Sequence, residues 1–366
     1  MDDARQPNPR VAGECRVFLA FEAGFSIDLV RAERRFPAGA REALPPSRRL
    51  PSDCDFAQKP LRIAIARAPL PMGAWRTEAT LEATLYDFGA ISIAFRIPFA
   101  APIADLAPLA AALWNNAELL AEARRVVEEL VATLADAIAR PELRPTAEDF
   151  AEDFVVFTID PGSCGGRATV DALDPRALAA LVRLEDAPIS ADGIADATSA
   201  PISYGPRDLV IVDWAAAVVV DAEPAATLAV LELANVQLAE LKHLDSELDR
   251  GLDAVWRMAD DRSLFARLRL RANLRKLAEL ELEGAALFDG VTNALKLHGD
   301  QHLARVQRAA VRRFRIEDWE RSIARRLETL GSISARLEAR QSQYRSEILE
   351  WIIIALIAFE IVRTFA

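Results

Sequence analysis

The sequence contains few cysteines and histidines, and this scarcity argues against several classes of protein. Its three cysteines, Cys15, Cys54 and Cys164, are scattered and form no Cys-x-x-Cys pair. A disulfide scaffold or a cysteine-based zinc site is therefore not expected, and a reducing compartment is the better assignment. No histidine occurs in the first 220 residues, where Cys164 lies. A Cys-His or Ser-His catalytic pair is accordingly not expected.

Basic residues are also in deficit, with 44 Lys and Arg against 55 Asp and Glu and a net charge of −11. Neutralising phosphates requires a basic surface, so this balance argues against general affinity for nucleic acid, although a local basic patch stays open. Hydrophobic residues make up 52% of the chain and charged residues 27%, which is typical of a folded protein. The polar, acidic start of the chain matches neither a signal peptide nor a transit peptide.

The first half of the chain has the pattern of an α+β domain. Residues 1–13 are expected to form a flexible tail, and 14–221 a head domain in which helices cover one face of a mixed sheet. Period-two alternation or short apolar runs predict strands at 17–21, 61–66, 79–86, 90–97, 154–159, 208–213 and 216–220. Helical periodicity predicts helices at 27–36, 106–115, 117–139 and 176–182.

The character of the sequence changes at Asp221, after which strand signals almost disappear. Leucines at three- and four-residue steps predict helices over 224–256 and 264–297, and a third helix from Gln301 that bends near Gly331. Residues 222–347 are thus expected to form a long antiparallel helical stalk. One heptad position recurs through the third helix and marks a candidate oligomer interface: Ile323, Leu330, Leu337 and Tyr344, with Leu327 and Ile333 beside it.

The most apolar stretch is the C-terminal segment, residues 348–366. Its eighteen residues from Ile348 to Phe365 would extend about 27 Å as a helix, close to the roughly 30 Å of a hydrocarbon core. Glu350 and Arg363 lie at the ends, whereas Glu360 is deeper and would need Arg363 or an oligomeric interface beside it. The segment predicts a membrane anchor. The alternative is a buried C-terminal helix of a soluble oligomer.

This segment also carries a resemblance. The pattern of Leu-Glu-Trp, an aliphatic run, Glu and a β-branched residue resembles the C-terminal signature of the required-for-meiotic-nuclear-division family, also called domain of unknown function 155. The matching residues are Leu349, Glu350, Trp351, Ile352, Ile353, Ile354, Leu356, Ile357, Phe359, Glu360 and Ile361. Residues 231–241 are similar to that family's long helix. The resemblance implies a membrane-associated homo-oligomer linked to translation, and it implies no catalytic role for these residues.

Three further motifs have a functional and a structural interpretation. His298 and His302 have metal-ligand spacing, but a third ligand is lacking apart from Asp300, so an interhelical turn is favoured. Gly162–Arg167 follows a strand as a phosphate loop would, but it lacks the Gly-Lys-Ser/Thr ending. Arginines including Arg267, Arg271, Arg312 and Arg325 form either a solvated helix face or a surface for anionic lipid or RNA.

Together these features predict a non-enzymatic, homo-oligomeric scaffold with no cofactor, no metal and no catalytic residue. A single C-terminal anchor would hold it at the inner membrane with the bulk of the chain cytoplasmic, because basic residues precede the apolar segment. Its expected partners are itself, membrane lipid and a further protein, and nucleic acid is less favoured. The alternatives are a soluble nucleotide-binding protein or enzyme that uses Gly162–Arg167, and an RNA-binding adaptor that uses the stalk arginines.

Overall fold

The structure is a computed structural model. It describes residues 10–36, 54–56, 58–141, 151–163, 173–205, 207–260, 282, 284–286, 288–290, 295–297, 300–333, 335–336, 353–354 and 356–357. The chain divides into two compact units, Met1–His243 with Asp289–Trp319, and Leu244–Phe288 with Glu320–Ala366. The first unit runs past Asp221, the expected end of the head domain, and takes in a segment that the sequence analysis assigned to the stalk.

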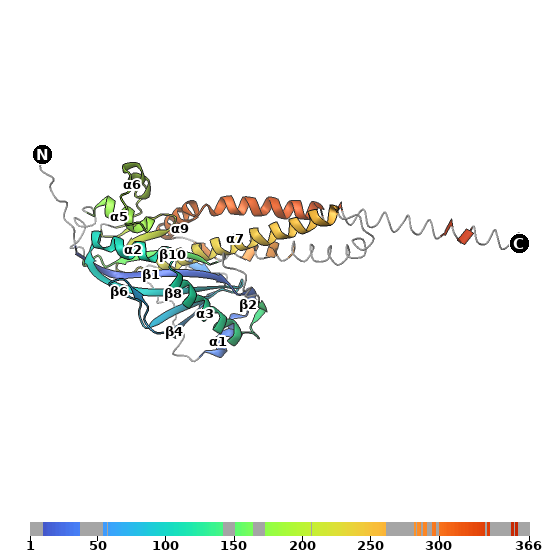
Figure 1. Cartoon of the computed structure of the whole chain (residues 1–366), viewed down its shortest axis with the longest axis horizontal. Coiled ribbons are helices and arrows are strands. Elements are labelled where there is room, and N and C mark those ends of the chain that lie inside the picture. The colour runs from blue at the N-terminus through green and yellow to red at the C-terminus, as the bar shows by residue number, and fades with distance from the viewer. Residues whose placement is uncertain are drawn as a thin grey trace. The chain divides into compact units, whose positions relative to one another are not determined.

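A seven-stranded mixed sheet forms the centre of the first unit, in the order β11-β12-β10-β1-β8-β7-β4 (Figure 1). Its strands are β1 (Arg10–Glu22), β4 (Leu61–Ala66), β7 (Thr80–Leu85), β8 (Ala90–Pro102), β10 (Glu152–Ile159), β11 (Leu209–Val212) and β12 (Ala216–Val220). Within this sheet β10 and β12 run parallel, and the other neighbours run antiparallel. The predicted α+β class with a mixed sheet is confirmed.

The longest strand pair is β1 with β8, in register from Arg10 opposite Pro102 to Glu22 opposite Ala90. Residues 10–13, which were expected in the flexible tail, therefore belong to the sheet, and residues 1–9 lie outside the described part. Gly13 allows β10 to approach, because a Cβ there would lie 1.9 Å from the carbonyl oxygen of Thr158. The alternation of β1 sends Val17, Leu19 and Phe21 to one face and Phe18 and Ala20 to the other.

The face with Val17, Leu19 and Phe21 packs in one core with three helices. These are α2 (Ala107–Leu113), α3 (Ala117–Thr133) and α5 (Pro175–Arg183). The side chain of Asn116 accepts hydrogen bonds from the backbone N–H groups of Glu118 and Leu119, which fixes the start of α3. Between α5 and β11 lies the short helix α6 (Ala191–Ala197).

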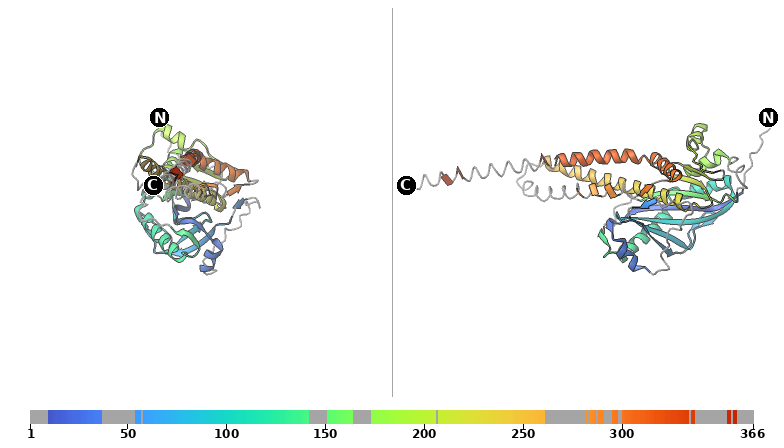
Figure 2. Two further views of the ribbon diagram at one scale, coloured as in Figure 1. Left: turned by 90° about the vertical axis from the view of Figure 1, so that its right-hand side faces the viewer. Right: turned by 180° about the vertical axis from the view of Figure 1, so that it is seen from behind.

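Helices cover the opposite face as well, so the expectation that they cover one face alone is wrong. The first part of α7 (Ala225–Asp260) lies against this face, where the Asn235 side chain donates to the backbone carbonyl of Glu152. After α9 (Gln301–Arg313), the ring of Phe314 packs edge-on against Phe154 at 4.9 Å. Figure 2 shows the sheet and its helices from two further directions.

The ends of two expected helices are strands. Helix α3 ends at Thr133, and the last two residues of the expected helix, Ile138 and Ala139, belong to β9 (Ile138–Pro141), which pairs with β2 (Gly24–Ile27). Likewise Leu295–Leu297, expected to end the second long helix, forms β13 and pairs with β3 (Cys54–Phe56). Distant strand partners outweigh local helical periodicity at both places.

Smaller elements complete the first unit. The expected helix over 27–36 is shorter and begins after Asp28, as α1 (Leu29–Arg35). The remaining elements are β5 (Pro71–Met72), β6 (Trp75–Arg76) and a 3₁₀ turn, η2 (Ile103–Leu106).

The described part of the second unit is helical. A Cβ on Gly284 would lie 3.2 Å from both Leu244 and Leu327, so three helical segments meet there. Residues 316–333 are helical without interruption at Gly331, and the break after α9 is at Arg315, which has a positive φ of 55°. Arg326 forms ion pairs with Asp245, at 3.0 Å, and with Asp249.

Two of the oligomer-interface candidates, Ile323 and Leu330, are fully buried within the single chain. Their heptad spacing therefore already serves packing inside this chain, whereas Leu337, Tyr344 and Glu360 lie outside the described residues. Of the C-terminal segment the structure describes Ile353, Ile354, Leu356 and Ile357, which are helical. Among the residues described, no helix is long and apolar enough to cross a membrane.

Candidate functional site

The most distinctive surface of the first unit is a row of arginines on α9. Asp300 caps this helix by accepting hydrogen bonds from the backbone N–H groups of His302 and Leu303, at 2.9 and 3.0 Å. The buried face of α9 consists of Leu303, Val306 and Ala310. Because a helix turns once every 3.6 residues, Arg305, Arg308 and Arg312 share the exposed side.

These arginines line an open groove of about 640 Å³, here called the arginine groove. One wall is the segment 200–202, which is fixed to the sheet edge by two backbone hydrogen bonds between Ile202 and Val210, each 2.8 Å long. The other wall is α9 and the turn that follows it. The full lining is Ala200, Pro201, Ile202, Arg305, Arg308, Ala309, Val311, Arg312, Arg315, Glu317 and Asp318.

The positive charge of the groove is only partly neutralised. Arg315 forms an ion pair with Asp318 at 2.7 Å. Arg305 and Arg308 donate to backbone carbonyls, those of Ser203 and Ala304. Within the described ranges, Arg305, Arg308 and Arg312 form no ion pair with a carboxylate. The four arginines thus exceed Glu317 and Asp318 by two positive charges.

An exposed aromatic side chain lies beside this row. Tyr204 is 80% exposed, and its ring packs edge-on against His302, with the ring centroids 6.3 Å apart. The backbone N–H groups of Tyr204 and Gly205 donate to the carboxylate of Asp208, at 2.7 and 2.5 Å, and this holds the turn that carries the tyrosine. The structure therefore places an aromatic face one helical turn before Arg305.

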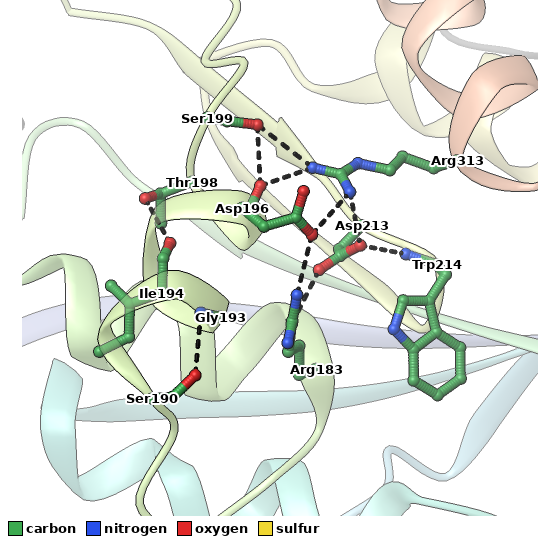
Figure 3. Close-up of polar contacts among 10 residues, drawn as sticks. All are labelled: Arg183, Ser190, Gly193, Ile194, Asp196, Thr198, Ser199, Asp213, Trp214 and Arg313. Carbon is green, nitrogen blue, oxygen red and sulfur yellow. Dashed lines mark hydrogen bonds and ion pairs between the residues drawn. The ribbon is translucent and has the colours of Figure 1, made fainter.

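A network of two arginines and two aspartates anchors α9 (Figure 3). Arg183 of α5 contacts Asp213 at 3.2 Å and Asp196 at 2.9 Å. Arg313 contacts the same two carboxylates at 3.5 and 3.1 Å, and it also donates to the backbone carbonyl of Asp196. The Asp213 side chain is 1% exposed, so this network fixes α9 against α5, α6 and the β11–β12 turn.

A second group of charged residues lies between α7 and the sheet. Residues 226–241 of α7 are all buried, and they include Glu232, Asn235, Gln237 and Glu240. Arg62 of β4 pairs with Glu232 at 2.9 Å. Farther along the helix, Lys242 pairs with Glu152 at 2.6 Å and His243 with Glu22 at 2.5 Å. These pairs join α7 to strands that lie far from it in the sequence.

Burial changes the acidity of several groups in this layer. Burial first, and the negative charge of Glu22 next, raise the pKa of Glu240 well above its usual value, and neither carboxyl oxygen has a hydrogen-bond partner among the described residues. The pKa of Tyr86 is also raised well above its usual value, by burial first and by the negative charge of Glu232 next, while the positive charge of Arg62 opposes the shift. Buried groups of perturbed pKa occur at active sites, but also in structural networks. Since Glu232 and Lys242 in this layer pair with strand residues Arg62 and Glu152, a structural role fits better.

The glycine-rich loop after β10 is described only at its start. Asp160 accepts a hydrogen bond from the backbone N–H of Gly162 at 2.8 Å, and the Ser163 hydroxyl donates to the carbonyl of Asp160 at 2.6 Å. One backbone N–H group of the loop is thus already bonded to a carboxylate of the same loop. Residues 164–167, with Cys164, lie outside the described part.

Of the other residues singled out from the sequence, some are described by the structure and others lie outside the described part. His298, Arg267 and Arg271 lie outside the described residues, as do the C-terminal motif residues other than Ile353, Ile354, Leu356 and Ile357. Within the described residues no group of three or more His, Cys, Asp or Glu side chains is placed to hold a metal ion. Cys15 is buried, and burial raises its thiol pKa well above the usual value, which disfavours a reactive thiolate.

Arg312 was among the arginines expected in the third helix, whereas Arg305, Arg308 and Tyr204 were not predicted as functional residues. The spacing of three and four residues from Arg305 to Arg312, opposite Leu303, Val306 and Ala310, was a signal that could have found the arginine row. No sequence signal places Tyr204 beside α9, because the contact joins residues about one hundred positions apart.

Comparison with known proteins gives a family for the first unit's sheet. Residues 12–226 match the family described as "Uncharacterized protein MJ0711, N-terminal domain". A curated relative, "Uncharacterized protein MJ0711" of Methanocaldococcus jannaschii, is 22% identical over 191 residues, which are 52% of this chain and 59% of the relative. The chain therefore spans less than two thirds of that relative's length. No solved structure matches this chain.

The matched range ends well before the Leu-Glu-Trp motif at residues 349–351, so it does not bear on the resemblance to the required-for-meiotic-nuclear-division family, which stays a prediction. It covers β1 to β12 and ends where α7 begins. On this match, the chain belongs to the family of the MJ0711 N-terminal domain.

Proposed function

We propose that the protein is a non-enzymatic scaffold that is attached to a membrane by its C-terminal segment. The observation that carries this proposal is the exposure of the four described residues of that segment. Ile353, Ile354, Leu356 and Ile357 are helical, and their exposed fractions are between 54 and 62%. Contiguous aliphatic surface of this kind is typically covered by lipid or by another protein.

The charges that precede the segment support a membrane as the cover. Arg321, Arg325 and Arg336 are exposed in the described part of the preceding helix. Basic residues near an apolar span are attracted to anionic lipid, by about 1 kcal/mol each, and favour the cytoplasmic side. The proposal therefore places the bulk of the chain on the cytoplasmic face of the inner membrane.

Self-association is the second part of the proposal. Because Ile323 and Leu330 are buried within one chain, the contacts between copies are assigned to the C-terminal segment itself. Glu360 supports this, since carboxylates at membrane depth usually face protein. A role in translation, implied by the family resemblance, would concern the further protein partners that the scaffold holds.

The test is membrane fractionation with an alkaline carbonate wash, comparing the full chain with one truncated after Tyr344. The full chain should stay in the membrane pellet, and the truncated chain should be released. The matched control is the full chain with Arg34→Glu, which changes an exposed charge on α1 and should leave the pellet unchanged. Release of both chains by carbonate would refute the anchor and favour a protein-covered helix.

A nucleotide-binding protein or enzyme that uses Gly162–Arg167 is the alternative. It is less well supported because Asp160 already accepts the Gly162 N–H. It predicts that ATP or GTP raises the melting temperature of the purified chain and that Gly165→Val abolishes the shift. The absence of any shift would rule this site out.

A further inference from the structure

We infer that the arginine groove binds a single-stranded nucleic acid, with Arg305, Arg308 and Arg312 contacting successive phosphates and Tyr204 stacking on a base. None of the residues that line this groove belongs to the C-terminal segment. The inference therefore does not depend on membrane attachment.

The first step is the chemistry of the three arginines. A guanidinium keeps its charge at every physiological pH and matches the oxygen geometry of a phosphate. Arg305, Arg308 and Arg312 have no carboxylate partner among the described residues, and their side chains line one groove. Their charge is thus available to an anionic ligand.

The second step is their spacing. From His302 to Arg312 the helix rises about 15 Å, at 1.5 Å per residue, and it presents one arginine at about every turn. A repeating row of charge suits a ligand with repeating phosphates. A small ligand with one phosphate would leave most of the row unused.

The third step is the aromatic side chain beside the start of the row, where Tyr204 packs against His302. Proteins that bind single strands combine a basic groove with exposed aromatic side chains on which bases stack. Tyr204 is 80% exposed and packs against His302, one turn before Arg305. The turn that carries Tyr204 is held in place by Asp208, which accepts hydrogen bonds from the backbone N–H groups of Tyr204 and Gly205.

The shape of the site favours a strand over a lipid surface. The arginines line a groove whose second wall, residues 200–202, is fixed to β11. A bilayer surface is broad and would touch the rims, whereas a strand can enter. Because the whole chain carries a net charge of −11, overall attraction to nucleic acid is weak, and binding should be modest and sensitive to salt.

Fluorescence anisotropy of the purified full chain tests the site, using a labelled oligouridylate of about twelve nucleotides. Arg308→Glu with Arg312→Glu should weaken binding at least about tenfold and should flatten the dependence of log K on log salt, by about 0.7 for each phosphate that the variant no longer neutralises. Tyr204→Ala should weaken binding about tenfold and leave the salt slope unchanged, because stacking releases no counterions.

Charge-matched and structural controls complete the experiment. Arg34→Glu with Arg176→Glu changes two exposed arginines outside the groove and should leave affinity within about twofold, because neither contacts the strand. Arg308→Gln with Arg312→Gln removes charge without reversing it and should retain the same direction of effect. Circular dichroism of each variant should match the parent.

Three results would overturn the inference. One is absence of oligouridylate binding by the folded parent chain, and a second is an equal loss of affinity in the groove variant and in the Arg34/Arg176 control. The third is groove-dependent sedimentation with vesicles of phosphatidylserine and phosphatidylcholine in place of oligonucleotide binding, which would assign the groove to lipid headgroups. Loss of oligouridylate binding in the groove and Tyr204 variants alone would support the inference.

Discussion

Glu240 shows how a single buried residue influences the stability of the first unit. Its carboxyl lies between α7 and the sheet without a hydrogen-bond partner among the described residues. Burial, and then Glu22, raise its pKa well above the usual 4.5. A carboxyl of this kind binds its proton more tightly in the folded state than in the unfolded state. The free energy of unfolding should therefore be greatest at low pH and fall as pH rises above the unfolded pKa.

Glu240→Gln should remove this dependence, because glutamine has the same shape and no charge to lose. We expect the variant to be more stable than the parent at about pH 8, with the difference shrinking towards pH 5. Urea unfolding at both pH values measures it. Glu128→Gln, at an exposed position of α3, is the matched control and should follow the parent. An identical difference at the two pH values would contradict the assigned cause.

For single residues, the sequence predicts which side chains are apolar and buried, but it does not predict which residues form ion pairs or contacts with one another. The run from Ala225 to Leu241 contains no Lys or Arg, which is a signal of a fully buried helix that the sequence analysis did not use. The partner of Glu232 is Arg62, 170 positions away, and nothing local to either residue indicates the pair. The arginine groove could not be predicted from the sequence for the same reason, since one wall comes from residues 200–202 and the other from α9.

Among the elements, α9 is the one whose position depends most clearly on side chains. Arg313 and Arg183 share Asp196 and Asp213, so four separate elements meet at two carboxylates. The two aspartates differ in environment, because the Asp213 side chain is 1% exposed and that of Asp196 is 57% exposed. Mutating each of them separately therefore compares a buried with an exposed carboxylate in the same network.

Asp213→Ala should lower the free energy of unfolding by about 2–3 kcal/mol, since it leaves two partly buried guanidinium groups without their shared carboxylate. Asp196→Ala should cost on the order of 1 kcal/mol or less, because solvent screens an exposed pair. Thermal unfolding of both variants tests the difference. Equal losses would mean that burial does not decide the strength of the network.

Element prediction succeeded where the local pattern and the tertiary contacts agree. The predicted bounds of β4 and β12 are those observed, and the third helix was predicted to begin at Gln301, as α9 does. It failed at Ile138 and Ala139 and at Leu295–Leu297, where pairing with β2 and β3 decides the conformation. Such pairing depends on residues more than one hundred positions away, so local periodicity cannot predict it.

At the scale of the whole molecule, the first unit is discontinuous in sequence. Its sheet is complete at Val220, but later residues pack on one face of that sheet: Asn235 of α7 bonds to Glu152, and Phe314, after α9, packs against Phe154. A domain boundary was expected at Asp221 because strand signals stop there. Composition marks where strands end, and it does not show which later helices return to the sheet.

A fragment of residues 1–226, which ends with the family match, should therefore be insoluble or should bind a hydrophobic dye such as ANS. It would expose Phe18, Phe154 and Val156, which are buried in the full chain. A fragment of residues 1–319 contains all of the first unit and should be soluble and cooperatively folded. A soluble, cooperatively unfolding 1–226 fragment would refute this account.

The discontinuity of the first unit also has a consequence for biosynthesis. The sheet is finished at Val220, but α9 and Phe314 leave the ribosome roughly one hundred residues later. At about 5–20 residues per second this is an interval of about 5–20 s. During that time part of one apolar face of a formed sheet is uncovered on the nascent chain. The protein should consequently depend on cotranslational chaperones more than its final burial suggests.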